Sequence, residues 1–312
     1  MNHAALPNPF PATFRRLGLA TPARPVAPER LARGRHQLAA WGLEGVEAVV
    51  AEPPSRYFSA TDALRTQAFN ALVRTAGLDA IWAIRGGYGS ARLLEQLDWE
   101  AWRRNPLPLI GYSDVSALHL AAFSQGIRTG LAGPMLAVEF GQEPASPAAA
   151  AALAFTTRSL ADAWQPCDAV SLPPGTRLNV LKPGMATGPV VPANLALLVS
   201  LVGTPWMPDL TGCILVVEDL NEAAYRIDRN LNQLRQAEVL SGLAGLVYAD
   251  FAQVEDGEWL PEILAEFAQV VRGPVLAGLP HGHCLPAVTI PVGRLAHLEA
   301  CLGNGELTTL SW

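Results

Sequence analysis

Short apolar runs alternate with helical patterns through the first half of the chain, and this alternation limits the fold more than any other feature of the sequence. It is typical of a mainly parallel sheet covered on both faces, so we expect function at the carboxyl ends of the strands. Ser59 and Asp62 are spaced like a capping box at the start of the second helix. The predicted strands are 15–21, 46–51, 79–84 and 106–112, and the predicted helices are 28–42, 61–77 and 114–126.

A second domain is predicted beyond about 141–190, where the alternation gives way to an Ala-rich helix and a Pro/Gly-rich segment. We expect an N-terminal domain at 1–150, a linking region at 151–185 and a smaller C-terminal α/β domain at 186–312. In this last domain we expect a buried helix at 194–203, a helix with Ile227, Leu231 and Leu234 on one face, and strands at 212–219, 242–250, 273–279 and 287–293.

Composition and charge exclude several classes of protein. Half of the 312 residues are hydrophobic and 16% are charged, which is typical of a folded chain with a buried core. The formal net charge of −6 and the absence of a Lys/Arg run argue against a nucleic acid or an anionic membrane as partner. The four cysteines are scattered, which favours a reducing compartment. With no export signal and no apolar stretch that could span a bilayer, we expect a cytoplasmic protein.

A glycine-rich loop follows the strand predicted at 79–84. Its three glycines, Gly86, Gly87 and Gly89, allow positive φ angles and expose backbone N–H groups in a concave turn. Such a turn fits an oxyanion hole, which needs only one or two N–H donors. A flexible loop or a phosphate cradle is the alternative, although the glycine spacing matches neither the P-loop nor the dinucleotide fingerprint.

Ser113 lies where the strand predicted at 106–112 turns directly into a helix. A serine at such a turn can act as a nucleophile, because it projects above the sheet near the positive end of the helix. The alternative is that Ser113 only caps the helix, as serine commonly does. The G-x-S-x-G pattern is absent, so the turn is not that of an ordinary α/β-hydrolase.

Two strand ends of the second half carry further reactive side chains. Glu218 and Asp219 follow an apolar strand, and His281 and His283 lie in a Gly/Pro-rich loop. The two histidines and Glu218 could hold zinc. Alternatively, Ser113, a carboxylate and a histidine can form a hydrolytic triad in this chain order. Spacing alone does not show that these groups meet.

Four motifs occur in order between residues 79 and 293: RGGYG, GYSD, ED-x-x-E-x-x-Y-x-I-D-R and G-x-P-x-G-H. With them the chain resembles the LD-carboxypeptidases, also called muramoyltetrapeptide carboxypeptidases, and the related microcin-immunity peptidases. The resemblance implies a flavodoxin-like N-terminal domain that carries the nucleophile and a C-terminal domain that carries the acid and base. The active site would then lie at the domain interface. It also suggests a homodimer, and we expect no metal or cofactor.

The resemblance assigns the triad by motif. The serine of GYSD is Ser113, the first acid of the ED-x-x-E segment is Glu218, and the last histidine of G-x-P-x-G-H is His283. The resemblance thus selects Glu218 over Asp219 and His283 over His281, choices that spacing leaves open.

The resemblance also implies an oxyanion hole made of backbone N–H groups, here those of Gly87 and Asp114. A carboxypeptidase must in addition recognise the terminal carboxylate of its substrate, for which arginine offers a two-pronged partner. Arg85 is the first candidate, because it opens the glycine turn, and Arg226 is the second. The alternative for Arg85 is that it pairs with a neighbouring acid and braces the loop.

The function implied is that of a serine carboxypeptidase with a Ser-His-Glu triad, which releases terminal D-alanine from murein tetrapeptides in peptidoglycan recycling. The alternatives are an amidase that cleaves aminoacyl-adenylate antibiotics and a peptide binder without activity. Three segments depart from the family pattern: Ala132-Gly133-Pro134, Pro192-Ala193-Asn194-Leu195 and Thr21-Pro22-Ala23-Arg24. No large insertion that would build a nucleotide-recognition loop is obvious, which favours a peptide substrate.

Overall fold

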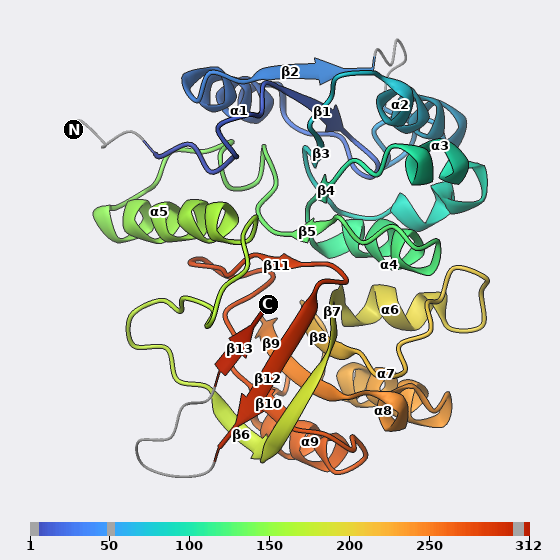
Figure 1. The fold of residues 1–312 in the computed structure, drawn as a ribbon, viewed down its shortest axis with the longest axis vertical. Coiled ribbons are helices and arrows are strands. Elements are labelled where there is room, and N and C mark those ends of the chain that lie inside the picture. The colour runs from blue at the N-terminus through green and yellow to red at the C-terminus, as the bar shows by residue number, and fades with distance from the viewer. Residues whose placement is uncertain (1–5, 49–53, 302–308) are drawn as a thin grey trace.

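The computed structural model describes residues 6–48, 54–301 and 309–312, and it contains two sheets (Figure 1). The first sheet has the order β11-β5-β4-β3-β1-β2. Its parallel strands are β1 (Arg16–Ala20), β2 (Glu44–Glu47), β3 (Ala80–Ala83), β4 (Leu109–Ile110) and β5 (Leu131–Ala132), and β11 (Ile290–Pro291) is antiparallel to β5. The order 2-1-3-4-5 of the parallel strands is flavodoxin-like, as expected.

Helices cover both faces of the first sheet. Helices α2 (Asp62–Arg74), α3 (Trp99–Arg104) and α4 (Ser116–Ser124) share one apolar core, and α1 (Pro28–Ala40) and α5 (Pro147–Asp162) share the other. Alternate residues of β3 enter the two cores, because Ile81 belongs to the first and Trp82 to the second. Short 3₁₀ helices, η1 (Ser90–Gln96) and η2 (Ser113–Val115), follow β3 and β4.

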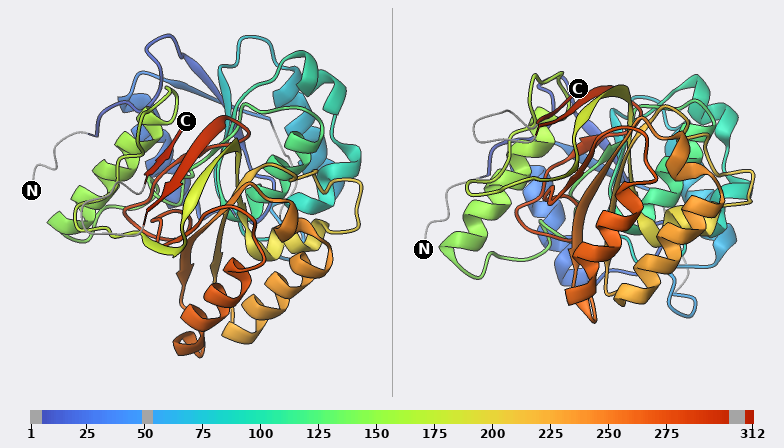
Figure 2. Two further views of the ribbon diagram at one scale, coloured as in Figure 1. Left: turned by 60° about the horizontal axis from the view of Figure 1, so that its bottom comes forward. Right: turned by 90° about the horizontal axis from the view of Figure 1, so that it is seen from below.

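The second sheet has the order β13-β12-β7-β8-β9-β10-β6, and its four central strands β7 to β10 are parallel. Figure 2 shows helices α7 (Ala224–Gln236) and α9 (Leu260–Ala268) side by side along one of its faces. The strands are β6 (Asn179–Lys182), β7 (Gly184–Asn194), β8 (Ile214–Leu220), β9 (Gly245–Ala252), β10 (Val275–Ala277), β12 (Leu295–Ala300) and β13 (Thr309–Ser311). The helices are α6 (Leu195–Leu201), α7 (Ala224–Gln236), α8 (Val239–Gly242), η3 (Gly257–Trp259) and α9 (Leu260–Ala268).

The predicted elements of the first half overlap observed ones, with differences at their ends. Strand β2 begins two residues before its prediction, whose end at 49–51 lies outside the described residues. The predicted capping box is wrong, because Thr61 caps α2 by accepting a hydrogen bond from the backbone N–H of Leu64. Ser59 instead donates its hydroxyl proton to the carbonyl oxygen of Thr21 at 2.8 Å.

The two halves of the chain are interleaved. Strand β11 lies in the chain between β10 and β12 of the second sheet and yet extends the first, and Figure 1 shows it between the two sheets. Helix α5 crosses the predicted boundary at residue 150 and packs on the first sheet, while β6 lies in the predicted linking region and pairs with β10. The bounds 1–150, 151–185 and 186–312 therefore stay a prediction.

Hydrogen bonds also tie α5 to the loop that precedes β11. The backbone N–H of Ala287 donates to Thr156 Oγ1 at 2.9 Å, and that of Thr289 donates to Ser159 Oγ at 2.8 Å. The loop after β10 is thereby fixed against the first half of the chain. In the part of the chain that the structure describes, no helix is long and apolar enough to cross a membrane.

Candidate active site

Ser113 lies on a strained turn at the carboxyl end of β4. Its φ angle is +61°, a left-handed conformation that costs a residue with a Cβ atom about 1–2 kcal/mol. The chain turns here directly from β4 into η2 and α4, as a nucleophile elbow requires. The Ser113 hydroxyl caps neither helix, so the capping alternative is wrong.

His283 connects Ser113 to Glu218. Its Nε2 lies 3.0 Å from Ser113 Oγ, and its Nδ1 lies 2.6 Å from Glu218 Oε2. Because an ionised carboxylate only accepts hydrogen bonds, the Nδ1 atom carries the proton and donates it to Glu218. In the neutral imidazole, Nε2 is then left to accept the Ser113 hydroxyl proton. Three side chains that lie far apart in the sequence thus form one hydrogen-bonded chain.

The electrostatics of His283 favour its protonated form. Burial lowers the pKa of His283, but the hydrogen bond and the charge of Glu218 outweigh burial and raise that pKa above its ordinary value. The carboxylates of Asp219 and Glu139 act in the same direction. An imidazolium formed at this position is therefore stabilised by its surroundings.

The titration of His283 tests this electrostatic arrangement. We expect its imidazole NMR signals to titrate above about pH 6.5, the ordinary value for histidine. In Glu218→Gln the midpoint should move to lower pH, because the negative charge is removed while burial remains. His119 is the internal control, since burial lowers its pKa to about 4. An unchanged His283 midpoint in Glu218→Gln would contradict the assignment of Glu218.

Asp114 joins the glycine turn to the serine turn. Its fully buried carboxylate accepts hydrogen bonds from the backbone N–H groups of Gly89 at 3.1 Å and Ser90 at 2.9 Å. Burial raises the pKa of Asp114, and these N–H donors only partly offset that effect. Among the described residues, no group accepts a hydrogen bond from the backbone N–H of Gly87 or Asp114. Both N–H groups therefore lack a protein acceptor among the described residues.

Asp219, the neighbour of Glu218, has a different role. Its carboxylate accepts hydrogen bonds from Asn194 Nδ2 at 2.9 Å and from the backbone N–H of Ala196 at 3.0 Å, at the start of α6. Burial raises the pKa of Asp219 to about 6. The backbone N–H of Asn194 in turn donates to Ser116 Oγ on α4 at 3.0 Å. Asp219 thus anchors the contact between the two sheets, while Glu218 contacts His283.

The zinc interpretation of the histidine loop finds no support in the geometry. His281 is buried, and its Nδ1 donates to the carbonyl oxygen of Val288 at 2.8 Å. Over residues 6–48, 54–301 and 309–312, no three His, Cys, Asp or Glu side chains come together as metal ligands would. His281 therefore supports the loop, and only His283 contacts Ser113.

Gly282 allows Glu218 to reach His283. Its φ angle is +101°, and a Cβ atom added there would lie 2.5 Å from Glu218 Oε2. Any side chain at this position would occupy the space of the carboxylate. The second glycine of the G-x-P-x-G-H motif, Gly282, is thus required, because Glu218 of β8 lies so close to it.

The two candidate arginines occupy different surroundings. Arg85 is partly buried beside the glycine turn, and its Nη1 donates to the carbonyl oxygen of Pro25 at 3.0 Å. No acidic side chain pairs with Arg85 among the residues described, so the acid partner of the bracing alternative is not found, although the bond to Pro25 does hold the segment after β1. Arg226 is exposed on α7 and forms an ion pair with Glu222 at 3.5 Å. No described contact joins Arg226 to Ser113, Glu218 or His283.

One partly buried pair beside the site was not predicted from the sequence. The Tyr112 ring meets the His283 ring edge-on, with 5.1 Å between their centroids, and its hydroxyl donates to Glu139 Oε1 at 2.8 Å. Burial raises the pKa of Glu139 to about 7. A cavity of about 490 Å³ opens beside these residues. Tyr112 stands in the GYSD motif and could have been noticed, whereas no motif marks Glu139.

Comparison with known proteins matches two family models to the chain. The LD-carboxypeptidase N-terminal domain matches residues 17–132, and the LD-carboxypeptidase C-terminal domain matches residues 187–298. A murein tetrapeptide carboxypeptidase of Pseudomonas aeruginosa is 31% identical over 294 residues, which cover 91% of this chain and 93% of that protein.

Two further matches extend over most of the chain. The microcin C7 self-immunity protein of Escherichia coli is 28% identical over 302 residues, which cover 87% of this chain and 86% of that protein. The crystal structure of a muramoyltetrapeptide carboxypeptidase from Oxalobacter formigenes is similar with a TM-score of 0.79 at 26% identity. That similarity covers 95% of this chain and 97% of the other, so both sheets have counterparts there.

Proposed function

The chain belongs to the LD-carboxypeptidase family, and from this premise we propose that it is a serine carboxypeptidase. It hydrolyses the L,D-amide bond that releases terminal D-alanine from murein tetrapeptides, in the recycling of peptidoglycan. The observation that carries the proposal is the hydrogen-bonded chain from Ser113 through His283 to Glu218. The name of the Pseudomonas aeruginosa relative supports the choice of substrate.

The proposed reaction proceeds through an acyl-enzyme. His283 Nε2 accepts the hydroxyl proton of Ser113 as Ser113 Oγ attacks the amide carbon. Glu218 keeps Nδ1 protonated and stabilises the imidazolium. The imidazolium then gives its proton to the leaving amine of D-alanine. A water molecule, deprotonated by His283, hydrolyses the ester and restores Ser113.

The backbone N–H groups of Gly87 and Asp114 are the proposed oxyanion hole. Both lie in turns held together by the Asp114 carboxylate, and neither has an acceptor among the described residues. Donors fixed in advance stabilise the tetrahedral intermediate without reorganising, and one such donor contributes about 3 kcal/mol.

Arg85 is the proposed partner of the substrate's terminal carboxylate. It opens the glycine turn, it is partly buried, and no described acid neutralises it. Removal of a carboxylate from water needs a charged partner, which a guanidinium supplies with two parallel hydrogen bonds. Arg226 is less suited to this role, since Glu222 already pairs with it.

A comparison of two peptides tests the function together with the role of Arg85. We expect release of D-alanine from a murein tetrapeptide with a free terminal carboxylate, and kcat/KM about 10- to 100-fold lower for the C-terminal amide, from about 1.5–3 kcal/mol for a charged hydrogen bond. The Arg85→Gln variant should lose this preference, because it removes the charge. Glutamine still offers an N–H donor to the Pro25 carbonyl.

Several outcomes contradict parts of the proposal. A preference that survives in Arg85→Gln shows that the carboxylate is bound elsewhere. Hydrolysis of an aminoacyl-sulfamoyl adenosine in place of the peptide favours the amidase alternative, which the name of the Escherichia coli relative suggests. Peptide binding without any release of D-alanine favours the inactive binder.

A further inference from the structure

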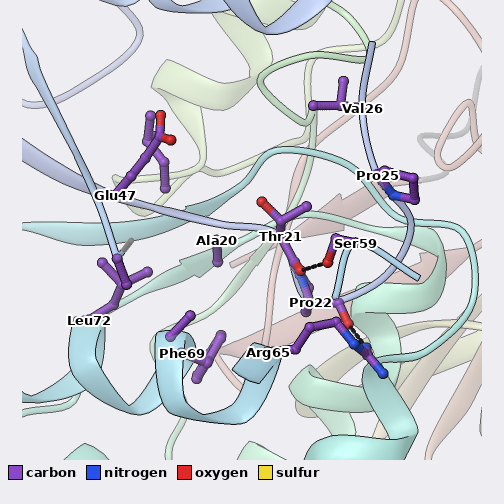
Figure 3. Close-up of a pocket in the computed structure, with 13 residues that line it drawn as sticks. Ala20, Thr21, Pro22, Pro25, Val26, Glu47, Ser59, Arg65, Phe69 and Leu72 are labelled. Carbon is purple, nitrogen blue, oxygen red and sulfur yellow. Dashed lines mark hydrogen bonds between the residues drawn. The ribbon is translucent and has the colours of Figure 1, made fainter. Parts of the chain in front are cut away.

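The segment that follows β1 is fixed by hydrogen bonds along its backbone. Ser59 donates its hydroxyl proton to Thr21 and its backbone N–H to Ala23, at 2.8 and 2.9 Å. The Arg65 guanidinium donates to the carbonyl oxygen of Pro22, and Figure 3 shows this bond beside that of Ser59. Arg85 completes the set with its bond to the next proline, Pro25. The backbone on both sides of residue 24 is therefore held in place.

Arg24 projects from this fixed segment onto the glycine turn. A Cβ atom added at Gly87 would lie 2.6 Å from Arg24 Cγ and 2.7 Å from Arg24 Cδ. The aliphatic part of Arg24 thus covers Gly87, whose N–H is a proposed oxyanion-hole donor. The residue is exposed, and within the described ranges neither a carboxylate nor any other acceptor pairs with its guanidinium.

Positive charge accumulates beside this turn. Burial lowers the pKa of Arg85, and the charges of Arg24 and Arg30 lower it further. Arg30 donates to the side-chain amide of Gln142 and, among the described residues, pairs with no acid. Guanidinium groups that lie close together without acids repel one another, so an anion bound between them would be stabilised.

We propose that Arg24 is a second residue that binds the substrate's terminal carboxylate, which is held between Arg24 and Arg85 above the Gly87 turn. The proposal rests on the proposed function, because it names a further partner for the same carboxylate. Arg24 lies in one of the segments that depart from the family pattern. Recognition of the carboxylate therefore depends on a loop in which this chain departs from the family pattern. The rigid backbone of that loop positions the Arg24 side chain.

The Arg24→Met variant distinguishes the effect of the Arg24 charge from the effect of its aliphatic chain, which covers Gly87. Methionine keeps an aliphatic chain over Gly87 and removes only the guanidinium. We expect the ratio of kcat/KM for the free-acid peptide to that for its C-terminal amide to fall about 5- to 20-fold. Hydrolysis of the amide should fall much less than hydrolysis of the free acid, and circular dichroism shows whether the variant is folded. Arg24→Lys should recover part of the ratio, because it restores the charge without the two-pronged geometry.

The matched control is Arg272→Met. Arg272 is exposed just before β10, at the end of that strand opposite the histidine loop, and its replacement changes the net charge by the same amount. We expect the ratio of kcat/KM for the free-acid peptide to that for its C-terminal amide to be the same in Arg272→Met as in the wild type. A similar fall in Arg272→Met would overturn the proposal, since the effect would then follow net charge alone.

Two further results overturn the proposal in different ways. If the acid-to-amide ratio of kcat/KM is unchanged in Arg24→Met but is lost in Arg85→Gln, Arg85 alone binds the carboxylate. The proposed function then still holds. An equal fall for acid and amide shows that Arg24 only covers the oxyanion hole. Absence of D-alanine release by the wild type is a separate outcome, which removes the proposed function and this inference with it.

Discussion

Ser113→Ala, Glu218→Ala and His283→Ala should each reduce kcat for D-alanine release by about 10⁴- to 10⁶-fold. The three side chains form one hydrogen-bonded chain, so the loss of any member leaves the others without their function. For the same reason, double variants should fall little below the single ones. Steady-state kinetics on the tetrapeptide, with circular dichroism to confirm folding, provide the measurement.

His281→Asn is the control for these variants. The asparagine amide can still donate a hydrogen bond to the Val288 carbonyl, which His281 Nδ1 does in the wild type. We expect its kcat to remain within a few-fold of the wild type, because His281 contacts neither Ser113 nor Glu218 among the described contacts. A loss in His281→Asn as large as that in His283→Ala would contradict the assignment of the base.

Gly282→Ala should reduce kcat by about 10²- to 10⁴-fold through displacement of Glu218. A Cβ atom at this position would lie 2.5 Å from Glu218 Oε2, and Glu218 is only 1% exposed, so it has little room to move. When the carboxylate no longer orients the imidazole, a serine hydrolase loses up to about 10⁴ in kcat. The kinetics should be accompanied by the NMR titration of His283, whose midpoint should fall.

Gly203→Ala is the matched control. Gly203 also has a positive φ, +83°, but no described atom lies within 4 Å of the Cβ position. Both variants share a backbone cost of about 1–2 kcal/mol, while only Gly282→Ala adds the clash. Equal losses of activity in the two variants would show that strain alone is responsible, and would contradict the proposed role of Gly282.

The sequence predicted the first sheet well because its evidence is local. Each buried strand is a short apolar run, and helix α2 shows an apolar periodicity of its own. Element ends were less accurate, as the cap of α2 shows: Ser59 and Thr61 are both suitable caps, and the tertiary bond from Ser59 to Thr21 decides between them. Strand β11 could not be assigned to the first sheet, since only two residues pair, with a strand far away in the chain.

The candidate site shows the same division between local and distant information. The turn at Ser113 was predicted from residues beside it, whereas the choice between Glu218 and Asp219 depends on contacts with other parts of the chain. Asp219 accepts a hydrogen bond from the start of α6, whereas Glu218 is hydrogen-bonded to His283 in the histidine loop. Arg24 was noticed only as a departure from the family pattern, because nothing in its neighbours shows that it lies on Gly87.

The late return of the chain to its first sheet has a consequence for synthesis on the ribosome. Strand β5 ends at Ala132, and its antiparallel neighbour begins at Ile290. At about 5–20 residues per second, the nascent chain exposes this edge for roughly ten to thirty seconds before its partner exists. An unpaired edge can recruit other chains, but one only two residues long offers few backbone groups to them. Because β5 is so short, we expect little pairing of this edge with other chains in the time between the synthesis of β5 and that of β11.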